Sequence, residues 1–116
     1  MRKLAGAAVL FLAVGTASAE PVKMTGAEIT EALTGHGVKG VWGETAYTST
    51  FNKDGTTVYT AEGKAPDTGT WRVKGDQYCS VWAGSGEDCY DLERDGDTII
   101  WIVPASGARY PSTLVD

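Results

Sequence analysis

Apolar and polar residues alternate in short runs between Gly69 and Val103, with glycine- and aspartate-containing turns between the runs. Alternation with a period of two is typical of strands that bury one face. The turns Lys74-Gly75-Asp76 and Arg94-Asp95-Gly96-Asp97 have the composition of hairpin connections. The pattern predicts a three-strand antiparallel meander followed by a strand that is apolar on both faces, over Thr70–Lys74, Gln77–Trp82, Cys89–Arg94 and Thr98–Val103.

The period of two also assigns the residues of this meander to faces. The core face receives large apolar or aromatic side chains, namely Trp71, Tyr78, Trp82, Tyr90 and Leu92. Cys79 and Cys89 fall on the more polar face of their strands. We therefore expect the two cysteines to lie outside the hydrophobic core.

The rest of the chain adds further strands and one helix. A hairpin signal at Lys53-Asp54-Gly55 joins two expected strands, and a segment with Pro111 suits an edge strand. The helix is expected over Thr25–Thr34, with Thr25 and Glu28 as a capping box and Gly35 as its stop. The remaining expected strands are Val38–Trp42, Thr45–Asn52, Thr56–Ala61 and Arg109–Val115.

These elements predict an all-β domain with one short N-terminal helix. About six to eight antiparallel strands would form a strongly curled sheet or a small barrel, because the chain has one amphipathic helix and too few residues for a second layer of helices. The narrow apolar face of the helix, Ile29 and Leu33, predicts that it lies across one opening or edge of the sheet.

The first 19 residues have the pattern of a secretory signal peptide. Arg2 and Lys3 precede an apolar run that is too short to span a membrane, and a small-residue cleavage site ends at Ala19. Cleavage there would leave residues 20–116 as a single domain, periplasmic or secreted and without a membrane span. Removing two of ten basic residues leaves eight against fifteen acidic ones, a net charge of −7 that argues against nucleic acid as a partner.

Two cysteines in an exported chain most simply form one bridge. Cys79 and Cys89 would sit opposite or nearly opposite each other if their strands pair through the intervening loop. A redox-active pair usually has the Cys-x-x-Cys spacing at a helix start, which this chain lacks. We therefore predict a structural disulfide.

Catalytic and metal-binding patterns are weak. His36 is the single histidine, and Ser49, Ser80 and Ser85 lack the surroundings of a nucleophile motif. One histidine and two oxidised cysteines do not make a zinc site. The acidic turn at 91–97 has a calcium-loop beginning, but Ile102 occupies the position of the required glutamate. We expect no enzyme activity, cofactor or metal.

The aromatic residues are the remaining candidates for function. Rings of this size either fill the core of a small domain or line the mouth of a barrel that holds an apolar or sugar ligand. Both interpretations stay open for each ring. The candidate ligand-binding residues are Trp42, Tyr47, Trp71, Trp82 and Trp101.

Two resemblances bear on the fold. Gly40-Val41-Trp42, after a short helix, resembles the Gly-x-Trp opening of lipocalins, and Gly69-Thr70-Trp71 repeats it. The run from Gly69 to Val73, with Tyr78-Cys79-Ser80-Val81-Trp82, Cys89-Tyr90 and Asp95-Gly96, is similar to small exported bacterial proteins of unknown function with a GTWR…CxxW…CY core. This second resemblance covers roughly the C-terminal half, and it implies a lipocalin-like β fold with a Cys79–Cys89 bridge and no activity.

Together these observations predict a non-enzymatic binding module for a small apolar ligand or a protein partner. The alternative is an exported protein inhibitor, or a small hydrolase, that uses the loop Gly84–Asp88. A short loop braced by a disulfide is a suitable element to hold rigid against a partner.

Overall fold

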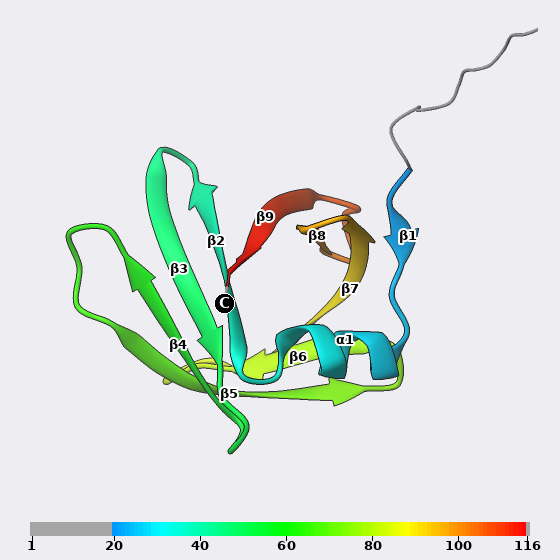
Figure 1. Ribbon diagram of the computed structural model, residues 1–116. Coiled ribbons are helices and arrows are strands. Elements are labelled where there is room, and N and C mark those ends of the chain that lie inside the picture. Colours follow the sequence, from blue (N-terminus) through cyan, green and yellow to red (C-terminus); the bar gives the residue numbers. More distant parts are fainter. Residues whose placement is uncertain (1–19, 116) are drawn as a thin grey trace, which may run out of the picture.

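The computed structural model of the chain describes residues 20–115, and the predicted signal peptide lies outside the described residues. Eight antiparallel strands form a closed barrel, because β2 pairs with β9 and β7 pairs with β8 (Figure 1). The predicted all-β fold with one N-terminal helix and a small antiparallel barrel is confirmed. The barrel strands are β2 (His36–Trp42), β3 (Thr45–Phe51), β4 (Thr56–Ala61), β5 (Asp67–Lys74), β6 (Gln77–Val81), β7 (Glu87–Asp95), β8 (Thr98–Ile102) and β9 (Arg109–Val115).

An additional short strand, β1 (Val22–Lys23), pairs with the end of β7. Strand β7 is longer than β6, whose pairing with it ends at Asp91. Val22 pairs with Arg94 and Lys23 with Glu93, so β1 continues the ladder where β6 stops. The sequence does not predict this strand, because two residues carry no periodic pattern.

The helix α1 (Gly26–Leu33) closes one end of the barrel. Thr25 is its N-cap, and both hydrogen bonds of the predicted capping box between Thr25 and Glu28 are present. Ile29 and Leu33 are fully buried and pack with the innermost barrel residues, including Leu92. The helix lies against β5, β6 and β2 (Figure 1), which places the hydrophobic core at this end. Among residues 20–115 no helix has the length and the apolar character that a membrane crossing requires.

Close packing at the start of α1 depends on a glycine. A Cβ atom on Gly26 would lie 2.1 Å from the carbonyl oxygen of Gly75, in the β5–β6 turn. The backbone N–H of Gly26 donates to Asp76 Oδ1 of the same turn at 2.7 Å. The helix start is therefore fixed to the turn that the sequence predicted at Lys74-Gly75-Asp76.

Strand β9 is not an edge strand, which corrects the sequence-based expectation. It lies between β8 and β2, and its pairing with β2 runs from Ser112, opposite Gly40, to Val115, opposite Gly37. Pro111 precedes that stretch, so the barrel tolerates a residue without a backbone N–H there. Closure brings together segments far apart in the sequence, which no local pattern reveals.

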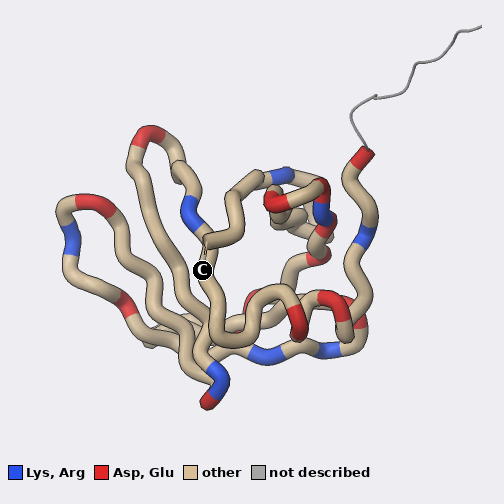
Figure 2. The backbone as a smooth tube through the Cα atoms, viewed as in Figure 1, with Lys and Arg blue, Asp and Glu red and all other residues tan. Residues whose placement is uncertain are grey.

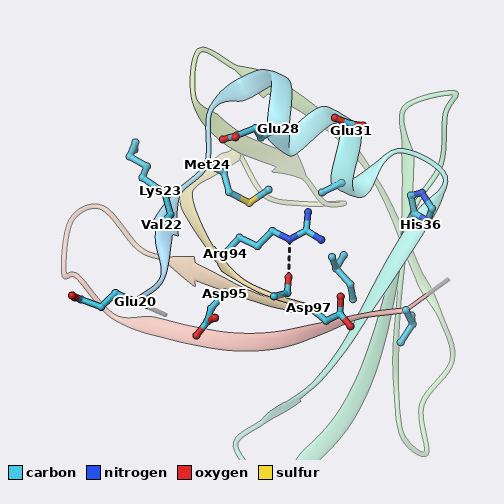
Figure 3. A pocket seen from close by; sticks show the side chains of 14 residues that line it. Glu20, Val22, Lys23, Met24, Glu28, Glu31, His36, Arg94, Asp95 and Asp97 are labelled. Atoms are coloured by element: carbon cyan, nitrogen blue, oxygen red, sulfur yellow. Dashed lines mark hydrogen bonds between the residues drawn. The ribbon is translucent and has the colours of Figure 1, made fainter. Parts of the chain in front are cut away.

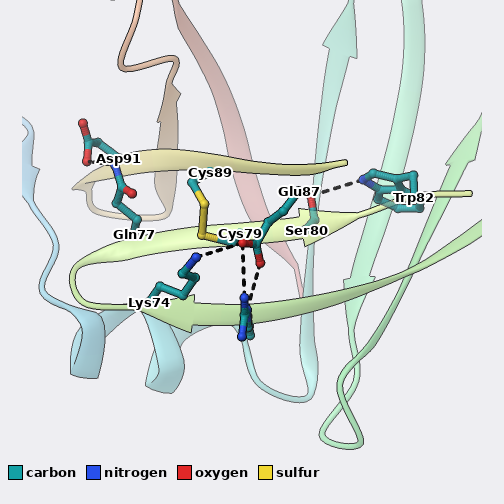
Figure 4. Close-up of a disulfide and its surroundings, with 9 residues drawn as sticks. Lys74, Gln77, Cys79, Ser80, Trp82, Glu87, Cys89 and Asp91 are labelled. Carbon is teal, nitrogen blue, oxygen red and sulfur yellow. Dashed lines mark hydrogen bonds and ion pairs between the residues drawn. A yellow bond between two sulfur atoms is a disulfide. The ribbon is translucent and has the colours of Figure 1, made fainter. Parts of the chain in front are cut away.

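The predicted disulfide is present on the outward-facing side of the β6–β7 pair, where Cys79 is fully buried. Cys79 and Cys89 are direct partners in the β6–β7 register, and their sulfur atoms are bonded. Glu87 lies beside the bridge and accepts from Arg72 Nε at 2.8 Å and from Lys74 Nζ at 2.9 Å (Figure 4). Hydrogen bonds from Arg72 and Lys74 lower the pKa of Glu87 to about 2. Because Arg72 and Lys74 are exposed, their ion pairs with Glu87 contribute little to the stability of the fold.

Candidate functional site

A cavity of about 320 Å³ opens at the end of the barrel opposite α1. Its lining is mostly aromatic, and no charged side chain contributes to it within the described chain. The volume is at the lower end of the range of roughly 300–1,000 Å³ that is typical of small-molecule sites. The lining residues are Val38, Trp42, Tyr47, Ser49, Phe51, Tyr59, Tyr78, Ser80, Trp82, Tyr90, Trp101 and Tyr110.

The floor of the cavity is formed by rings that also belong to the core. Phe51 lies 5.6 Å from Tyr78, and Tyr78 lies 4.8 Å from Trp101, both in edge-to-face arrangements between ring centroids. The indole Nε1 of Trp101 donates to Ser112 Oγ at 2.9 Å, which fixes the orientation of the ring. The floor is therefore a rigid apolar surface on which a ligand could rest.

The walls and the rim carry further ring pairs. Tyr47 and Tyr59 stack at 5.1 Å on neighbouring strands. At the rim, Trp42 packs on Tyr110 at 4.5 Å and is still 52% exposed. A large indole that is half exposed beside a cavity offers apolar surface that the fold itself does not bury.

Two glycines explain how the rings leave space between them. A Cβ atom on Gly40 would lie 2.8 Å from the hydroxyl of Tyr47, and one on Gly69 would lie 2.8 Å from the indole of Trp82. Gly40 therefore leaves room for the Tyr47 ring, and Gly69 leaves room for both the Val81 carbonyl oxygen and the Trp82 ring. At Gly40 the close approach is made by the side chain of Tyr47.

Four of the five candidate ligand-binding residues line this cavity: Trp42, Tyr47, Trp82 and Trp101. Trp71 does not line it. Its ring packs beneath the floor, 5.6 Å from Phe51, and its Nε1 donates to the carbonyl oxygen of Asn52 at 3.0 Å. Trp71 thus belongs to the core, one of the two roles that the sequence allowed.

Tyr59, Tyr90 and Tyr110 line the cavity, although we did not select them from the sequence. Strand alternation carried the signal for Tyr90, which it already placed on the core face. Tyr110 follows the same rule once β9 is recognised as a barrel strand, because it pairs with Trp101. The missing information was which of the inward rings lie near the open end.

The tyrosines keep the cavity uncharged at ordinary pH. Burial raises the pKa of Tyr59 and of Tyr47, with a smaller contribution to Tyr47 from its neighbour Tyr59. Burial, followed by the negative charge of Asp88, raises the pKa of Tyr90. Burial raises the pKa of Tyr78 to about 12, although hydrogen bonding with Ser80 and Thr57 acts in the opposite direction.

The raised pKa of Tyr78 predicts a loss of stability in alkali. Between pH 10 and pH 12 the unfolded chain releases the Tyr78 proton while the folded protein retains it, so the free energy of unfolding falls as the pH rises. Two pKa units correspond to about 2.7 kcal/mol. Replacing Tyr78 with phenylalanine should remove this part of the decrease. Urea unfolding at pH 9 to 12 measures the free energy of unfolding of both proteins. An equal decrease with pH in the two proteins would contradict the raised pKa of Tyr78.

A second hollow, of about 870 Å³, lies at the α1 end of the barrel (Figure 3). Arg94 reaches into it, and its Nε donates to the carbonyl oxygen of Gly96 at 2.7 Å. Carboxylates outnumber cations around this hollow, so it suits neither an anion nor an apolar molecule. The charged residues that line it are Glu20, Lys23, Glu28, Glu31, Arg94, Asp95 and Asp97.

His36 is exposed at this same end, at the start of β2. Ser49 and Ser80 are buried in the barrel wall, and both line the aromatic cavity at the other end. The structure therefore does not bring the histidine together with either serine.

One cluster of possible metal ligands occurs within residues 20–115, formed by Cys79, Glu87 and Cys89. Its two sulfur atoms are bonded to each other. A thiolate is the form of cysteine that binds a metal, and neither sulfur is available as one.

The predicted loop Gly84–Asp88 is shorter than the sequence suggested. Glu87 and Asp88 belong to β7, where they pair with Val81 and Ser80 of β6. The remaining turn is closed by its own hydrogen bond, from the backbone N–H of Ser85 to the carbonyl oxygen of Trp82 at 3.0 Å. The turn thus presents only small side chains.

Acidic residues lie beyond the aromatic lining at the open end of the barrel. Figure 2 shows acidic positions at the tips of the β2–β3 and β4–β5 hairpins, beyond the barrel wall.

Comparison of the chain with protein-family models, with curated proteins and with solved structures finds no match in any of the three. The two resemblances noted from the sequence therefore stay predictions.

Proposed function

We propose that this protein is an exported, non-enzymatic binding module that holds a small, uncharged, apolar ligand in the aromatic cavity. The observation that carries this proposal is the cavity itself: about 320 Å³, open to the outside and lined by rings without a charged side chain. Ligand sites are typically concave and mostly apolar, with few polar groups. The N-terminal pattern and the disulfide support export.

The shape of the site favours a flat molecule. Ring surfaces face the cavity from opposite parts of the barrel, with Tyr47 and Tyr59 on β3 and β4 and Tyr90 and Trp101 on β7 and β8. Flat apolar molecules pack well between such faces. A long lipid chain fits less well, because Phe51 and Tyr78 form the floor and the core residues of α1 fill the barrel below it.

A protein partner is the weaker alternative. A partner would have to contact the exposed rim, where Trp42 is the largest apolar side chain. The turn at 83–86 offers little to a protease-like partner, since its side chains are small. Most of the ring surface lies inside the cavity, which a protein segment does not readily enter. This arrangement favours a small ligand over a protein partner.

Tryptophan fluorescence tests the proposal. A panel of neutral one- and two-ring compounds, monosaccharides and fatty acids should yield saturable shifts with the ring compounds. Replacing Trp82 with phenylalanine should weaken binding about five- to tenfold, because it removes about 50 Å² of apolar contact.

Trp71→Phe is the matched control. It is the same substitution at an indole that packs below the floor, so binding should change by less than about twofold. Equal weakening by both substitutions would place the ligand outside the cavity. The absence of saturable binding across the whole panel would overturn the proposed function.

A further inference from the structure

Ser49 is a buried hydroxyl without a partner in the wall of the aromatic cavity. Its side chain is only 8% exposed, and it makes no hydrogen bond to another group in residues 20–115. Ser80, the other serine of the lining, is 4% exposed and accepts from Trp82 Nε1 at 3.2 Å (Figure 4). The hydroxyl of Ser80 is therefore hydrogen-bonded, whereas the hydroxyl of Ser49 is not.

The other buried serine and threonine hydroxyls of the barrel make hydrogen bonds. Ser112 donates to the carbonyl oxygen of Ile99 at 3.0 Å and accepts from Trp101. Thr57 donates to the carbonyl oxygen of Thr50 at 2.8 Å. Buried polar groups in folded proteins are nearly always hydrogen-bonded, so an exception that faces a cavity calls for a partner inside it.

The same lining argues against a charged partner for Ser49. An ionised carboxylate would lose its hydration on entering the cavity, and no lysine or arginine lines the wall to compensate. Asp88 lies near enough to Tyr90 to raise the pKa of its phenol, so an anion would also meet a negative charge. A neutral hydroxyl or carbonyl oxygen meets the requirement, because a serine hydroxyl both donates and accepts.

We propose that the cavity selects flat, uncharged ring compounds that carry a hydroxyl or carbonyl oxygen, and that this oxygen is hydrogen-bonded to Ser49 Oγ. The inference rests on the proposed function and adds to it the class of ligand. The rings supply contact area, whereas Ser49 sets the direction in which the ligand enters. The polar end points inward toward β3, and the apolar end points toward the rim at Trp42.

Three compounds of the same ring size test this selectivity by titration calorimetry: 2-naphthol, 2-methylnaphthalene and 2-naphthoate. We expect 2-naphthol to bind about tenfold more tightly than 2-methylnaphthalene, because one neutral hydrogen bond has about this net value. The naphthoate should bind most weakly of the three. In Ser49→Ala the preference for naphthol should fall to within about twofold, with the affinity for methylnaphthalene retained.

Thr48→Ala provides the matched control, because Thr48 neighbours Ser49 in β3 but is exposed on the opposite face of the strand. It should keep the full preference for naphthol, and melting curves of both variants check that each is folded. Equal binding of naphthol and methylnaphthalene by the unaltered protein would overturn the selectivity and leave the proposed function standing. A preference that survives Ser49→Ala would overturn the role of Ser49. Failure of all three compounds to bind would remove the proposed function as well.

Discussion

Replacing Phe51 with alanine is expected to lower the free energy of unfolding by about 3–5 kcal/mol, as large-to-small substitutions of buried aromatic residues do. Phe51 is 2% exposed and contacts three other rings, with centroid distances of 5.6 Å to Trp71, 5.6 Å to Tyr78 and 5.9 Å to Trp101. These rings come from three different strands, so the surrounding barrel has little freedom to collapse into the space. Urea denaturation at neutral pH measures the loss.

Val41→Ala is the control for this substitution. Val41 lies on β2, the strand paired with β3, but its side chain is 62% exposed. Its truncation should change the free energy of unfolding by less than about 0.5 kcal/mol. A loss below about 1.5 kcal/mol for Phe51→Ala would show that the ring cluster is not the main source of core stability.

At neutral pH, removal of the disulfide should have the second-largest effect. The bridge closes a loop with a sequence separation of 10 residues. The chain-entropy estimate for a loop of this length is about 2.7 kcal/mol. The double variant Cys79→Ala, Cys89→Ala should therefore melt at a clearly lower temperature than the oxidised protein.

The oxidised and the reduced, alkylated forms of the unaltered chain give a second comparison for the bridge. Mass spectrometry with and without reductant establishes that the two thiols are bonded before the comparison is made. An unchanged melting temperature in the double variant would mean that the paired β6 and β7 strands hold the hairpin without the bridge.

Local signals explain how much of the fold could be predicted from the sequence. The capping box at Thr25 and Glu28 and the stop at Gly35 are interactions between near neighbours, and both defined the helix correctly. Alternation placed Tyr78 and Leu92 in the core. Such features depend on a few consecutive residues, so the sequence carries them directly.

Pairing between distant segments could not be predicted in the same way. The edge position expected for Arg109–Val115 followed from Pro111, a local feature, whereas the actual position depends on β2 at the other end of the barrel. The short strand at Val22 forms because β7 extends beyond β6 and offers a free stretch for pairing. In each case the deciding contact is made by residues that are not neighbours in the sequence.

The site was predictable only as a set of rings. The sequence indicated that tryptophans and tyrosines could line a cavity, but the space depends on where small residues occur among them. Gly40, Gly69 and Ser49 provide that space or face it, and their significance is visible only when the strands are in register. Trp71 and Trp82 look alike in the sequence and differ only in the depth at which the barrel places them.

The closing ladder between β2 and β9 has a consequence for the order of folding. Gly37 pairs with Val115, so the barrel closes through two of the most widely separated residues of the domain. Bringing such distant segments together is entropically costly and slows folding, whereas each hairpin from β2 to β8 can form from neighbouring chain. The hairpins are therefore expected to form early and the ring-lined cavity last, since its wall is incomplete until β9 is in place. The ability to bind a ligand would then mark the end of folding, and intermediates would expose the aromatic rings to one another and to other chains.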